Sequence, residues 1–290
     1  MSKRNPEYDF KWCPGCGDFG VKRAVEAALT DRAATLSQPI ENSVIVAGIG
    51  CSGNLVHLQE GPQPFGIHGI HGRTLPIAYG LKSSRPDLNV LIVSGDGDFL
   101  SIGAEHIGPQ AKRNIDVTAI IMDNGVYGLT KGQASPTTEI EVITSTTPYG
   151  KLDDPSRPLE TYLAAGVSFL ASTLSTQVKA MQQLITEAME YPGFSIVHVQ
   201  SPCTTYNDNY AALKGNEKEG ILPMAYPIEE GHDAGDIDAA YRLARDSRIP
   251  VGIIYKREDS IPAHERLDLA RERTGATQKS VEELFQTMAI

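Results

Sequence analysis

The sequence has little of what marks membrane proteins, secreted proteins and nucleic-acid-binding proteins. None of its apolar runs approaches the roughly 18 to 20 residues that a membrane-spanning helix needs. The first ten residues lack the apolar centre of a secretory signal peptide. Basic residues are too few for a phosphate-binding surface, because 26 Lys and Arg stand against 36 Asp and Glu, a net charge of −10. We therefore expect a cytoplasmic protein with no membrane partner and no nucleic-acid partner.

Cysteine is also scarce, and the four that are present, Cys13, Cys16, Cys51 and Cys203, suffice for one thiolate site. A reducing cytoplasm argues against structural disulfides. The two-residue gap in Cys13-Pro14-Gly15-Cys16 lets both sulfurs reach one metal. Cys51 and Cys203 each follow a predicted buried strand, where open α/β sheets build their sites. The alternative is that these two are small buried apolar residues, with Cys13 and Cys16 acting as a redox pair or half a zinc site.

The 290 residues, 41% of them hydrophobic, alternate between strand and helix patterns. Helical periodicity predicts helices at 19–34, 75–81, 99–113, 174–190, 236–246 and 281–288. Short apolar runs predict strands at 43–49, 89–94, 116–122, 166–171, 194–200 and 251–255. Residues 124–158, rich in Thr, Ser, Pro and Gly, are predicted to form a long loop. The pattern favours an α/β fold with a doubly wound, mostly parallel sheet in residues 1–210 and a loop-rich C-terminal extension in residues 211–290.

A second group of polar residues follows the strand predicted at 89–94. Gly95-Asp96-Gly97-Asp98 ends that strand and opens a helix, so backbone N–H groups can approach a phosphate there. Asn124 ends the next strand, and 26 residues separate it from Gly97. The carboxylate of Asp96, the amide oxygen of Asn124 and a nearby backbone carbonyl are suitable ligands for Mg²⁺. Asp-Gly and Asn-Gly pairs are common turn formers when they stand alone, so the prediction depends on their spacing.

Six motifs in this order carry a resemblance to a known family. They are CPGCG at 13–17, GIGCSG at 48–53, HGR at 71–73, GDGD at 95–98, NGVYGLTKGQASPTT at 124–138 and SPC at 201–203. GDGD with the following Asn124 resembles the diphosphate-binding signature of thiamine-diphosphate enzymes. The complete set, over roughly residues 10–210, resembles the β subunit of 2-oxoacid:ferredoxin oxidoreductases.

The resemblance implies three cofactors: thiamine diphosphate, Mg²⁺ and a [4Fe–4S] cluster. The Mg²⁺ ligands would be Asp96, Asn124 and the carbonyl of Val126, and the four cysteines would hold the cluster. The residues implied at the thiamine diphosphate are Ile49, Gly50, Cys51, Ser52, His71, Gly72, Gly95, Asp96, Gly97, Asp98, Asn124, Val126, Tyr127, Gly128 and Leu129. His71 is the candidate catalytic residue, although a histidine in a Gly-rich turn is often a structural hydrogen-bonding group.

The implied reaction couples oxidative decarboxylation of a 2-oxoacid and coenzyme A to acyl-CoA, CO₂ and reduced ferredoxin. The HGR and YGLTKGQ forms resemble the 2-oxoglutarate branch, with Arg73 or Lys131 as the candidate cation for a second carboxylate. Because only one α/β domain is predicted, the carboxylate that promotes formation of the thiamine ylid is expected from an α subunit, in an α2β2 heterotetramer. The alternatives are a non-redox thiamine-diphosphate decarboxylase subunit and a zinc-stapled, non-catalytic subunit.

Overall fold

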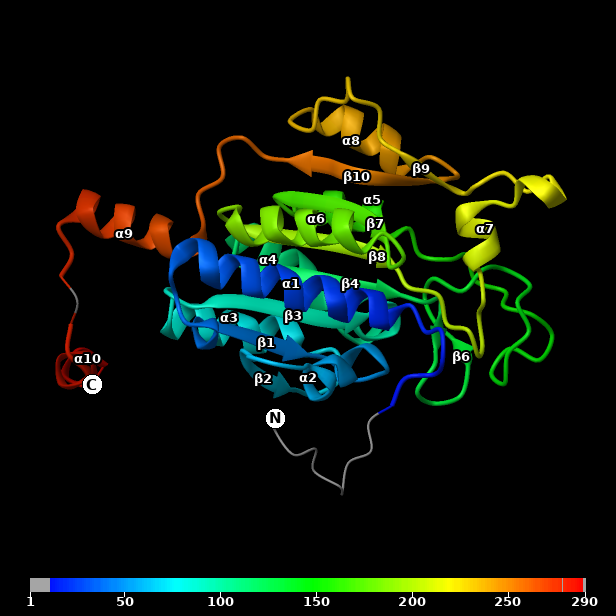
Figure 1. Ribbon diagram of the computed structural model, residues 1–290. Helices are drawn as coiled ribbons and strands as arrows, with labels where there is room; N and C mark the ends of the chain where they lie inside the picture. The colour runs from blue at the N-terminus through cyan, green and yellow to red at the C-terminus, as the bar shows by residue number, and fades with distance from the viewer. Residues whose placement is uncertain (1–10, 278, 289–290) are drawn as a thin grey trace.

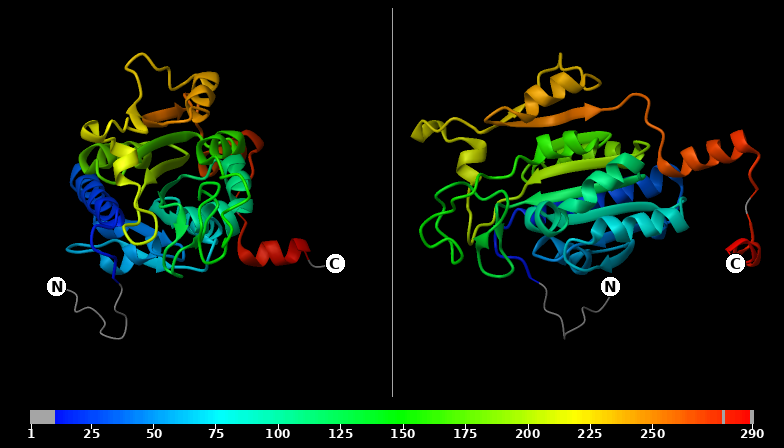
Figure 2. Two further views of the ribbon diagram at one scale, coloured as in Figure 1. Left: turned by 90° about the vertical axis from the view of Figure 1, so that its right-hand side faces the viewer. Right: turned by 180° about the vertical axis from the view of Figure 1, so that it is seen from behind.

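A central sheet with helices on both faces forms the body of the protein (Figures 1 and 2). The computed structural model describes residues 11–277 and 279–288. The eight strands lie in the order β2-β1-β3-β4-β8-β7-β10-β9, and all neighbouring pairs are parallel except β7 with β10. The strands of this sheet are β1 (Ser43–Ala47), β2 (Phe65–His68), β3 (Asn89–Gly95), β4 (Val117–Asp123), β7 (Phe169–Leu174), β8 (Phe194–Gln200), β9 (Ala225–Pro227) and β10 (Ile249–Lys256). A separate two-stranded ribbon pairs β5 (Val126–Tyr127) with β6 (Gln133–Ala134).

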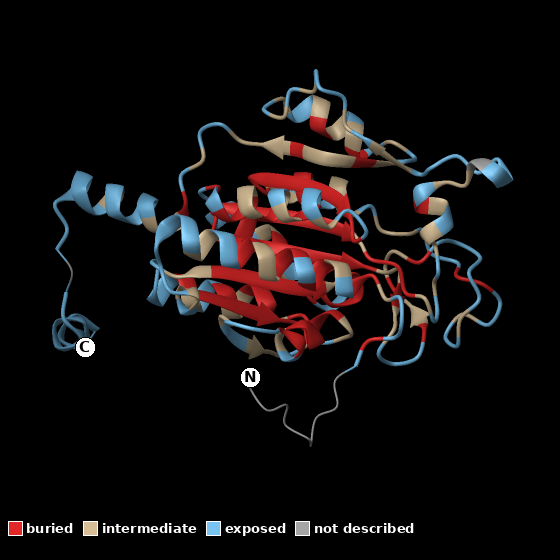
Figure 3. Cartoon of the chain, in the orientation of Figure 1, coloured by how far each residue is buried: buried red, intermediate tan, exposed pale blue. Residues whose placement is uncertain are grey.

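Two apolar cores lie on opposite faces of this sheet, because the central strands are rich in Val and Ile and point side chains to both sides. One core lies under α1 (Asp18–Leu36), α2 (Leu55–Leu58) and α6 (Val178–Glu190). The other lies under α3 (Thr74–Ser84), α4 (Ile107–Arg113), α5 (Pro158–Ala165) and α8 (Ile237–Ala244). Figure 3 shows the resulting buried centre. The predicted α/β class with a mostly parallel sheet is therefore confirmed.

The sequence pattern misplaced or missed several elements. The strand and helix predicted at 166–171 and 174–190 begin a few residues later, as β7 and α6. The helix predicted at 99–113 is broken into the π-helical turn η3 (Asp98–Ile102), a short 3-10 turn and α4. Strand β2 has only four residues and lies at the sheet edge, so it carries no apolar run to detect.

The C-terminal part contributes to the main sheet through β10, which pairs with β7. Helices α7 (Tyr210–Lys214) and α9 (Ala263–Thr274) were not predicted, whereas α8, β10 and α10 (Val281–Met288) lie where the pattern placed them. Helices α9 and α10 have no buried residue and extend away from the body (Figures 1 and 3). Among the described residues, no helix has the length and apolarity to cross a bilayer. The division at residue 210 stays a prediction.

Candidate active site

The loops that follow β1, β3, β4 and β8 meet at the carboxyl ends of these strands, because the strands are parallel and adjacent (Figure 1). This row of strand ends is the active-site edge of the sheet. This edge carries all the motifs of the sequence: the segment before α1, the turn after β1, GDGD at the end of β3, Asn124 after β4 and Cys203 after β8. Functional residues far apart in the chain are therefore neighbours here.

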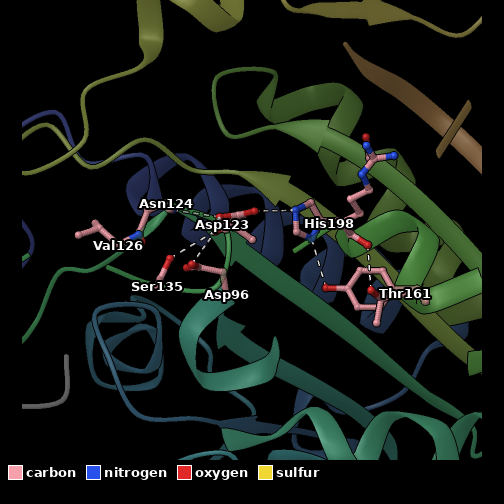
Figure 4. A network of polar contacts seen from close by, with 12 residues as sticks. Asp96, Asp123, Asn124, Val126, Ser135, Thr161 and His198 are labelled. Carbon is pink, nitrogen blue, oxygen red and sulfur yellow. Dashed lines mark hydrogen bonds and ion pairs between the residues drawn. The ribbon is translucent and has the colours of Figure 1, made fainter. Parts of the chain in front are cut away.

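Asp96 lies buried at the centre of this edge, close to the Asn124 turn (Figure 4). The Thr137 hydroxyl lies 2.8 Å from Asp96 Oδ2 and 2.7 Å from Asp123 Oδ1, so it can donate its proton to either carboxylate. Burial, and after it the nearby carboxylate of Asp123, raises the pKa of Asp96. Two carboxyl groups this close and this buried fit a site for a divalent cation, whose charge would offset the repulsion.

The Asn124 turn is held in place from three sides. The Val126 N–H donates to Asn124 Oδ1 at 3.0 Å, and Asn207 Nδ2 donates to the Asn124 carbonyl at 2.8 Å. The Gly125 N–H donates to Asp123 Oδ1 at 3.0 Å. The amide of Asn124 and the carbonyl of Val126 therefore belong to a fixed loop beside Asp96, which fits their predicted role as Mg²⁺ ligands.

Behind this turn lies a buried polar chain that sequence reasoning missed. His198 Nε2 lies 3.1 Å from Asp123 Oδ2, and the Tyr162 hydroxyl lies 3.4 Å from His198 Nδ1 (Figure 4). His198 pairs in register with Ile121, so its side chain points to the same face of the sheet as Ile121 and Asp123. A histidine inside an otherwise apolar strand, beside a strand that ends in Asp123, was the available signal.

Asp98 is engaged within the protein rather than open to a ligand. Its Oδ1 accepts hydrogen bonds from the N–H groups of Gly72 at 2.7 Å and Ile49 at 3.2 Å, and it pairs with His71 Nδ1. Its Oδ2 accepts from the Ser94 hydroxyl at 2.5 Å. Asp98 therefore orients the His71 ring through Nδ1 and leaves Nε2 as the ring nitrogen available for other partners.

Tyr127 joins the GDGD turn to His71. Its hydroxyl donates to the Gly97 carbonyl at 3.2 Å, and its ring lies edge-on to His71 with the centroids 6.4 Å apart. A Cβ atom on Gly97 would overlap the Tyr127 ring, so only glycine fits at this position. Buried Ser52 is near the same turn, since its Oγ lies 3.2 Å from the place of a Cβ on Gly95.

Of the two candidate cations for a substrate carboxylate, Arg73 is already occupied. Its guanidinium donates to the carbonyls of Gly72 at 3.1 Å and Ile102 at 2.8 Å, and it lies 3.2 Å from Glu105. Arg73 thus fixes the HGR loop. Lys131 is exposed, in the same loop as Leu129, which is exposed as well.

The four cysteines come from three segments that bond to one another. The Gly17 N–H donates to the Pro202 carbonyl at 3.0 Å, and Thr204 Oγ1 donates to the Pro14 carbonyl at 2.9 Å, which joins the first two cysteines to Cys203. Trp12 Nε1 donates to the Cys51 carbonyl at 2.7 Å. A Cβ on Gly128 would lie 3.4 Å from Cys51 Sγ and 3.9 Å from Cys203 Sγ, so these two sulfurs face the same residue.

Electrostatics indicates what these sulfurs can bind. Burial raises the pKa of the Cys51 thiol to about 12 and that of Cys16 further, and in both the next cause is the carboxylate of Asp18. Burial also raises the pKa of Asp18, to about 6. The other cysteines add repulsion, Cys203 and Cys13 on Cys51, and Cys51 and Cys203 on Cys16. Four thiolates at this place therefore need a strongly positive centre, and the donor set fits an iron–sulfur cluster.

The described residues contain no group of three or more His, Cys, Asp and Glu side chains that could hold a single metal ion. The predicted Mg²⁺ site would not form such a group, because only one of its three ligands, Asp96, is a His, Cys, Asp or Glu side chain. In a four-iron cluster each thiolate binds a different iron, so the sulfurs do not converge on one ion.

Comparison with known proteins agrees with this geometry. Residues 48–199 match the family model described as thiamine pyrophosphate enzyme, C-terminal TPP binding domain. Residues 203–272 match the family model for the C-terminal part of the pyruvate ferredoxin oxidoreductase beta chain. Together these matches run from the turn after β1 into α9, and the first covers the GDGD turn and Asn124.

Whole-chain relatives carry related names. The chain is 36% identical over 278 residues to a 2-oxoacid:ferredoxin oxidoreductase subunit beta of Sulfolobus sp, covering 91% of this chain and 87% of that protein. It is 37% identical to the 2-oxoglutarate synthase subunit KorB of Archaeoglobus fulgidus, covering 67% of this chain and 70% of that protein.

A solved structure is similar over almost the full length. It is the 2-oxoglutarate:ferredoxin oxidoreductase of Magnetococcus marinus with 2-oxoglutarate, coenzyme A and succinyl-CoA bound. The TM-score is 0.85 at 35% sequence identity, and the match covers 99% of this chain and 94% of that chain.

Proposed function

Because this chain belongs to the family of 2-oxoacid:ferredoxin oxidoreductase β subunits, we propose that it serves the coenzyme A-dependent oxidative decarboxylation of 2-oxoglutarate, with ferredoxin as electron acceptor. The observation that carries the choice of substrate is the likeness, at a TM-score of 0.85, to a solved enzyme with 2-oxoglutarate bound. The 37% identity to the 2-oxoglutarate synthase subunit of Archaeoglobus fulgidus supports the same choice.

The GDGD edge holds the cofactor in this proposal. Asp96, Asn124 and the Val126 carbonyl would hold Mg²⁺, whose charge would offset that of the diphosphate. The residues implied at the thiamine in the sequence line the rest of the site. When bound, thiamine diphosphate supplies the carbanion that attacks the 2-oxoacid and the electron sink that follows loss of CO₂.

The four cysteines would hold a [4Fe–4S] cluster, which would supply one-electron redox chemistry. A Cβ on Gly128 would lie 3.4 Å from Cys51 Sγ and 3.8 Å from Asn124 Nδ2, so residues proposed for the cluster and for Mg²⁺ both approach Gly128. Electron transfer from thiamine diphosphate to the cluster would require the two cofactors to lie close together. The buried Asp98 keeps His71 oriented beside Tyr127, so that Nε2 can exchange a hydrogen bond or a proton with the substrate.

The partners follow from the family. An α subunit supplies the second α/β domain, with the carboxylate that promotes ylid formation, and the complex is an α2β2 heterotetramer in the cytoplasm. Of the two candidate cations, we assign the second carboxylate of 2-oxoglutarate to the exposed Lys131, because Arg73 is engaged by carbonyls and Glu105. The comparisons do not favour the non-redox decarboxylase or the zinc-stapled subunit, since the relatives named above are oxidoreductase subunits or synthase subunits by name.

The test uses the α/β complex, purified without oxygen. We expect about four irons and four sulfides per β chain, and turnover of 2-oxoglutarate in preference to pyruvate with ferredoxin as acceptor. Cys203→Ser should lose iron and ferredoxin reduction together. Thr204→Ser is the matched control, because the hydroxyl next to Cys203 keeps its bond to the Pro14 carbonyl. One zinc and no sulfide would contradict the redox reaction, and preference for pyruvate would contradict the substrate.

A further inference from the structure

Asp18 is a buried acidic residue that the reaction described above does not use. It opens α1, two residues after Cys16, and its side chain is 1% exposed. Its Oδ1 accepts a hydrogen bond from the Ser201 hydroxyl at 2.6 Å. Ser201 stands two residues before Cys203, so this bond joins two of the segments that carry cysteines. The other oxygen, Oδ2, is buried and meets no hydrogen-bond partner among the described residues.

The charge of Asp18 is not paired with a cation in the described part of the chain. The nearest candidate on its own helix, Lys22, lies 3.2 Å from Glu26 and 3.9 Å from Glu60 instead. The amino end of α1 supports a negative charge through its unpaired N–H groups, but it does not neutralise one. The buried side chain of Asp18 lies where two cysteine segments meet, two residues after Cys16 and bonded to Ser201, which is two residues before Cys203.

A buried charge is costly, and a helix can begin equally well with an exposed Asp or Ser. At the position of Asp18, a negative charge would act electrostatically on a redox centre held by the cysteines. Reduction adds an electron to the cluster, and a fixed negative charge close by in a medium of low dielectric constant disfavours the reduced form. Net charge and hydrogen bonding around the sulfurs are the main factors that set cluster potentials.

We propose that Asp18 lowers the reduction potential of the iron–sulfur cluster, by placing a buried carboxylate where the segments of Cys16 and Cys203 meet. This inference rests on the proposed function, because it needs the cluster. Asp18 does not bind iron in this arrangement. It is a positioning residue that acts on the cluster through its charge, while its bond to Ser201 keeps that charge at a fixed place.

Asp18→Asn is the decisive variant, because it removes the charge and keeps an oxygen that can accept from Ser201. We expect the midpoint potential of the cluster in the α/β complex to shift to more positive values, with unchanged iron per chain. The potential is read from the electron paramagnetic resonance signal of the reduced cluster during a mediated titration. Asp31→Asn is the matched control on the same helix, since Asp31 is exposed and bonded to Gln182, and it should leave the potential unchanged.

Ser201→Ala separates the charge from the hydrogen bond. It leaves the carboxylate in place, so we expect a potential closer to wild type than that of Asp18→Asn. A positive shift as large as that of Asp18→Asn would overturn the inference, because the hydrogen bond would then carry the effect. If Asp18→Asn does not fold, Asp18→Ser carries the same expectation, since serine also begins helices well.

The remaining outcomes are also decisive. An intact cluster with the wild-type potential in Asp18→Asn overturns the role of Asp18 and leaves the proposed function standing. A folded Asp18→Asn chain without iron overturns it too, because Asp18 would then serve cluster assembly. Wild-type complex without iron and sulfide overturns both the inference and the proposed function.

Discussion

Asp98 joins three segments of the active-site edge through one carboxylate: the end of β1, the HGR loop and β3. Gly48 is required beside it, because a Cβ there would overlap the Asp98 side chain. A buried carboxylate that accepts several hydrogen bonds is favourable only while all its donors remain in place. The residue therefore connects stability and site geometry.

Asp98→Asn should destabilise the chain by about 2 to 4 kcal/mol, because the new amide group cannot accept at both positions and two N–H groups lose a charged acceptor. Urea unfolding measures the effect. Glu105→Gln is the control, since Glu105 is a surface partner of Arg73 and should cost less than about 1 kcal/mol. Equal stability of the two variants would show that the Asp98 contacts do not support the fold.

The raised pKa of Asp96 predicts how metal affinity depends on pH. In the metal-free chain the folded carboxyl holds its proton to a higher pH than an unfolded one, so Mg²⁺ must displace this proton at low pH. Below the raised pKa, we expect Mg²⁺ affinity to fall by about tenfold for each pH unit, and above it to level off. Calorimetric titration of the chain with Mg²⁺ and thiamine diphosphate at several pH values tests this. A flat profile would show that Asp96 is ionised throughout.

Individual site residues can be predicted from the sequence where they belong to a motif with a characteristic spacing. Asp96 and Asn124 could be predicted because strand ends place them together, and the structure brings them to one edge. Thr137 and His198 could not, because a threonine in a long loop and a histidine in a strand carry no spacing of their own. Asp98 is part of the predicted motif, yet only the structure shows that its partners are protein groups.

Among the elements, the π-helical turn η3 shapes the site most directly. It begins at Asp98, the last residue of GDGD, and is followed by Gly103, where a Cβ would lie 2.7 Å from the Asp98 carbonyl and 3.2 Å from Gly72. The chain must change its winding here so that the HGR loop can approach it. π-Helical turns are often found at functional sites.

Gly103→Ala should therefore destabilise the chain by about 1 to 3 kcal/mol, because backbone atoms cannot yield to the new methyl group. It should also weaken thiamine diphosphate binding, since Gly72 would be displaced. Gly108→Ala offers the matched control within α4, where a Cβ meets nothing within 4 Å. It should stabilise by about 0.5 to 1 kcal/mol. Thermal unfolding compares the two variants. An equal effect of both would show that the backbone around Gly103 can accommodate a methyl group.

The helix predicted at 99–113 shows why this turn escaped sequence analysis. Apolar residues recur at helical spacing through the whole segment, and a single glycine does not exclude a helix. The break depends on the contact between Gly103 and Gly72, which lie 31 positions apart in the chain. Periodicity detects only local spacing, so it cannot report such a contact.

At the scale of the whole molecule, the segment that contains β10 contributes more to the stability of the fold than the segment that contains α9 and α10. Strand β10 covers the edge of β7 and contributes the fully buried Ile254. Asn114 Nδ2 donates to the Ile261 carbonyl at 2.9 Å, and the Ala263 N–H donates to the Asn114 carbonyl at 3.0 Å. Beyond this point α9 and α10 bury no residue.

Deleting residues 266–290 should therefore change the melting temperature of the isolated chain by less than about 3 °C. Deleting residues 248–290 should give an aggregating chain, because the edge of β7 becomes exposed. Size-exclusion chromatography with thermal unfolding distinguishes the two truncations. Aggregation of both would show that α9 and α10 support the sheet.

The class of the fold was predictable from the alternation of buried strands and helices, since each parallel strand carries a continuous apolar run. The order of the strands was not, because nothing in the sequence of β8 says that it lies between β4 and β7. The antiparallel direction of β10 could not be predicted either, because an apolar run gives the same pattern for a parallel and an antiparallel strand.

The bond between the Gly17 N–H and the Pro202 carbonyl has a consequence for synthesis of the protein. Cys13 and Cys16 leave the ribosome early, but Cys203 follows 190 residues after Cys13. Until β8 has been made and has joined the sheet, Cys203 cannot join the first three thiols. With the cluster proposed above, delivery of iron and sulfide to the complete set of four cysteines would therefore be a late step in the synthesis of the protein.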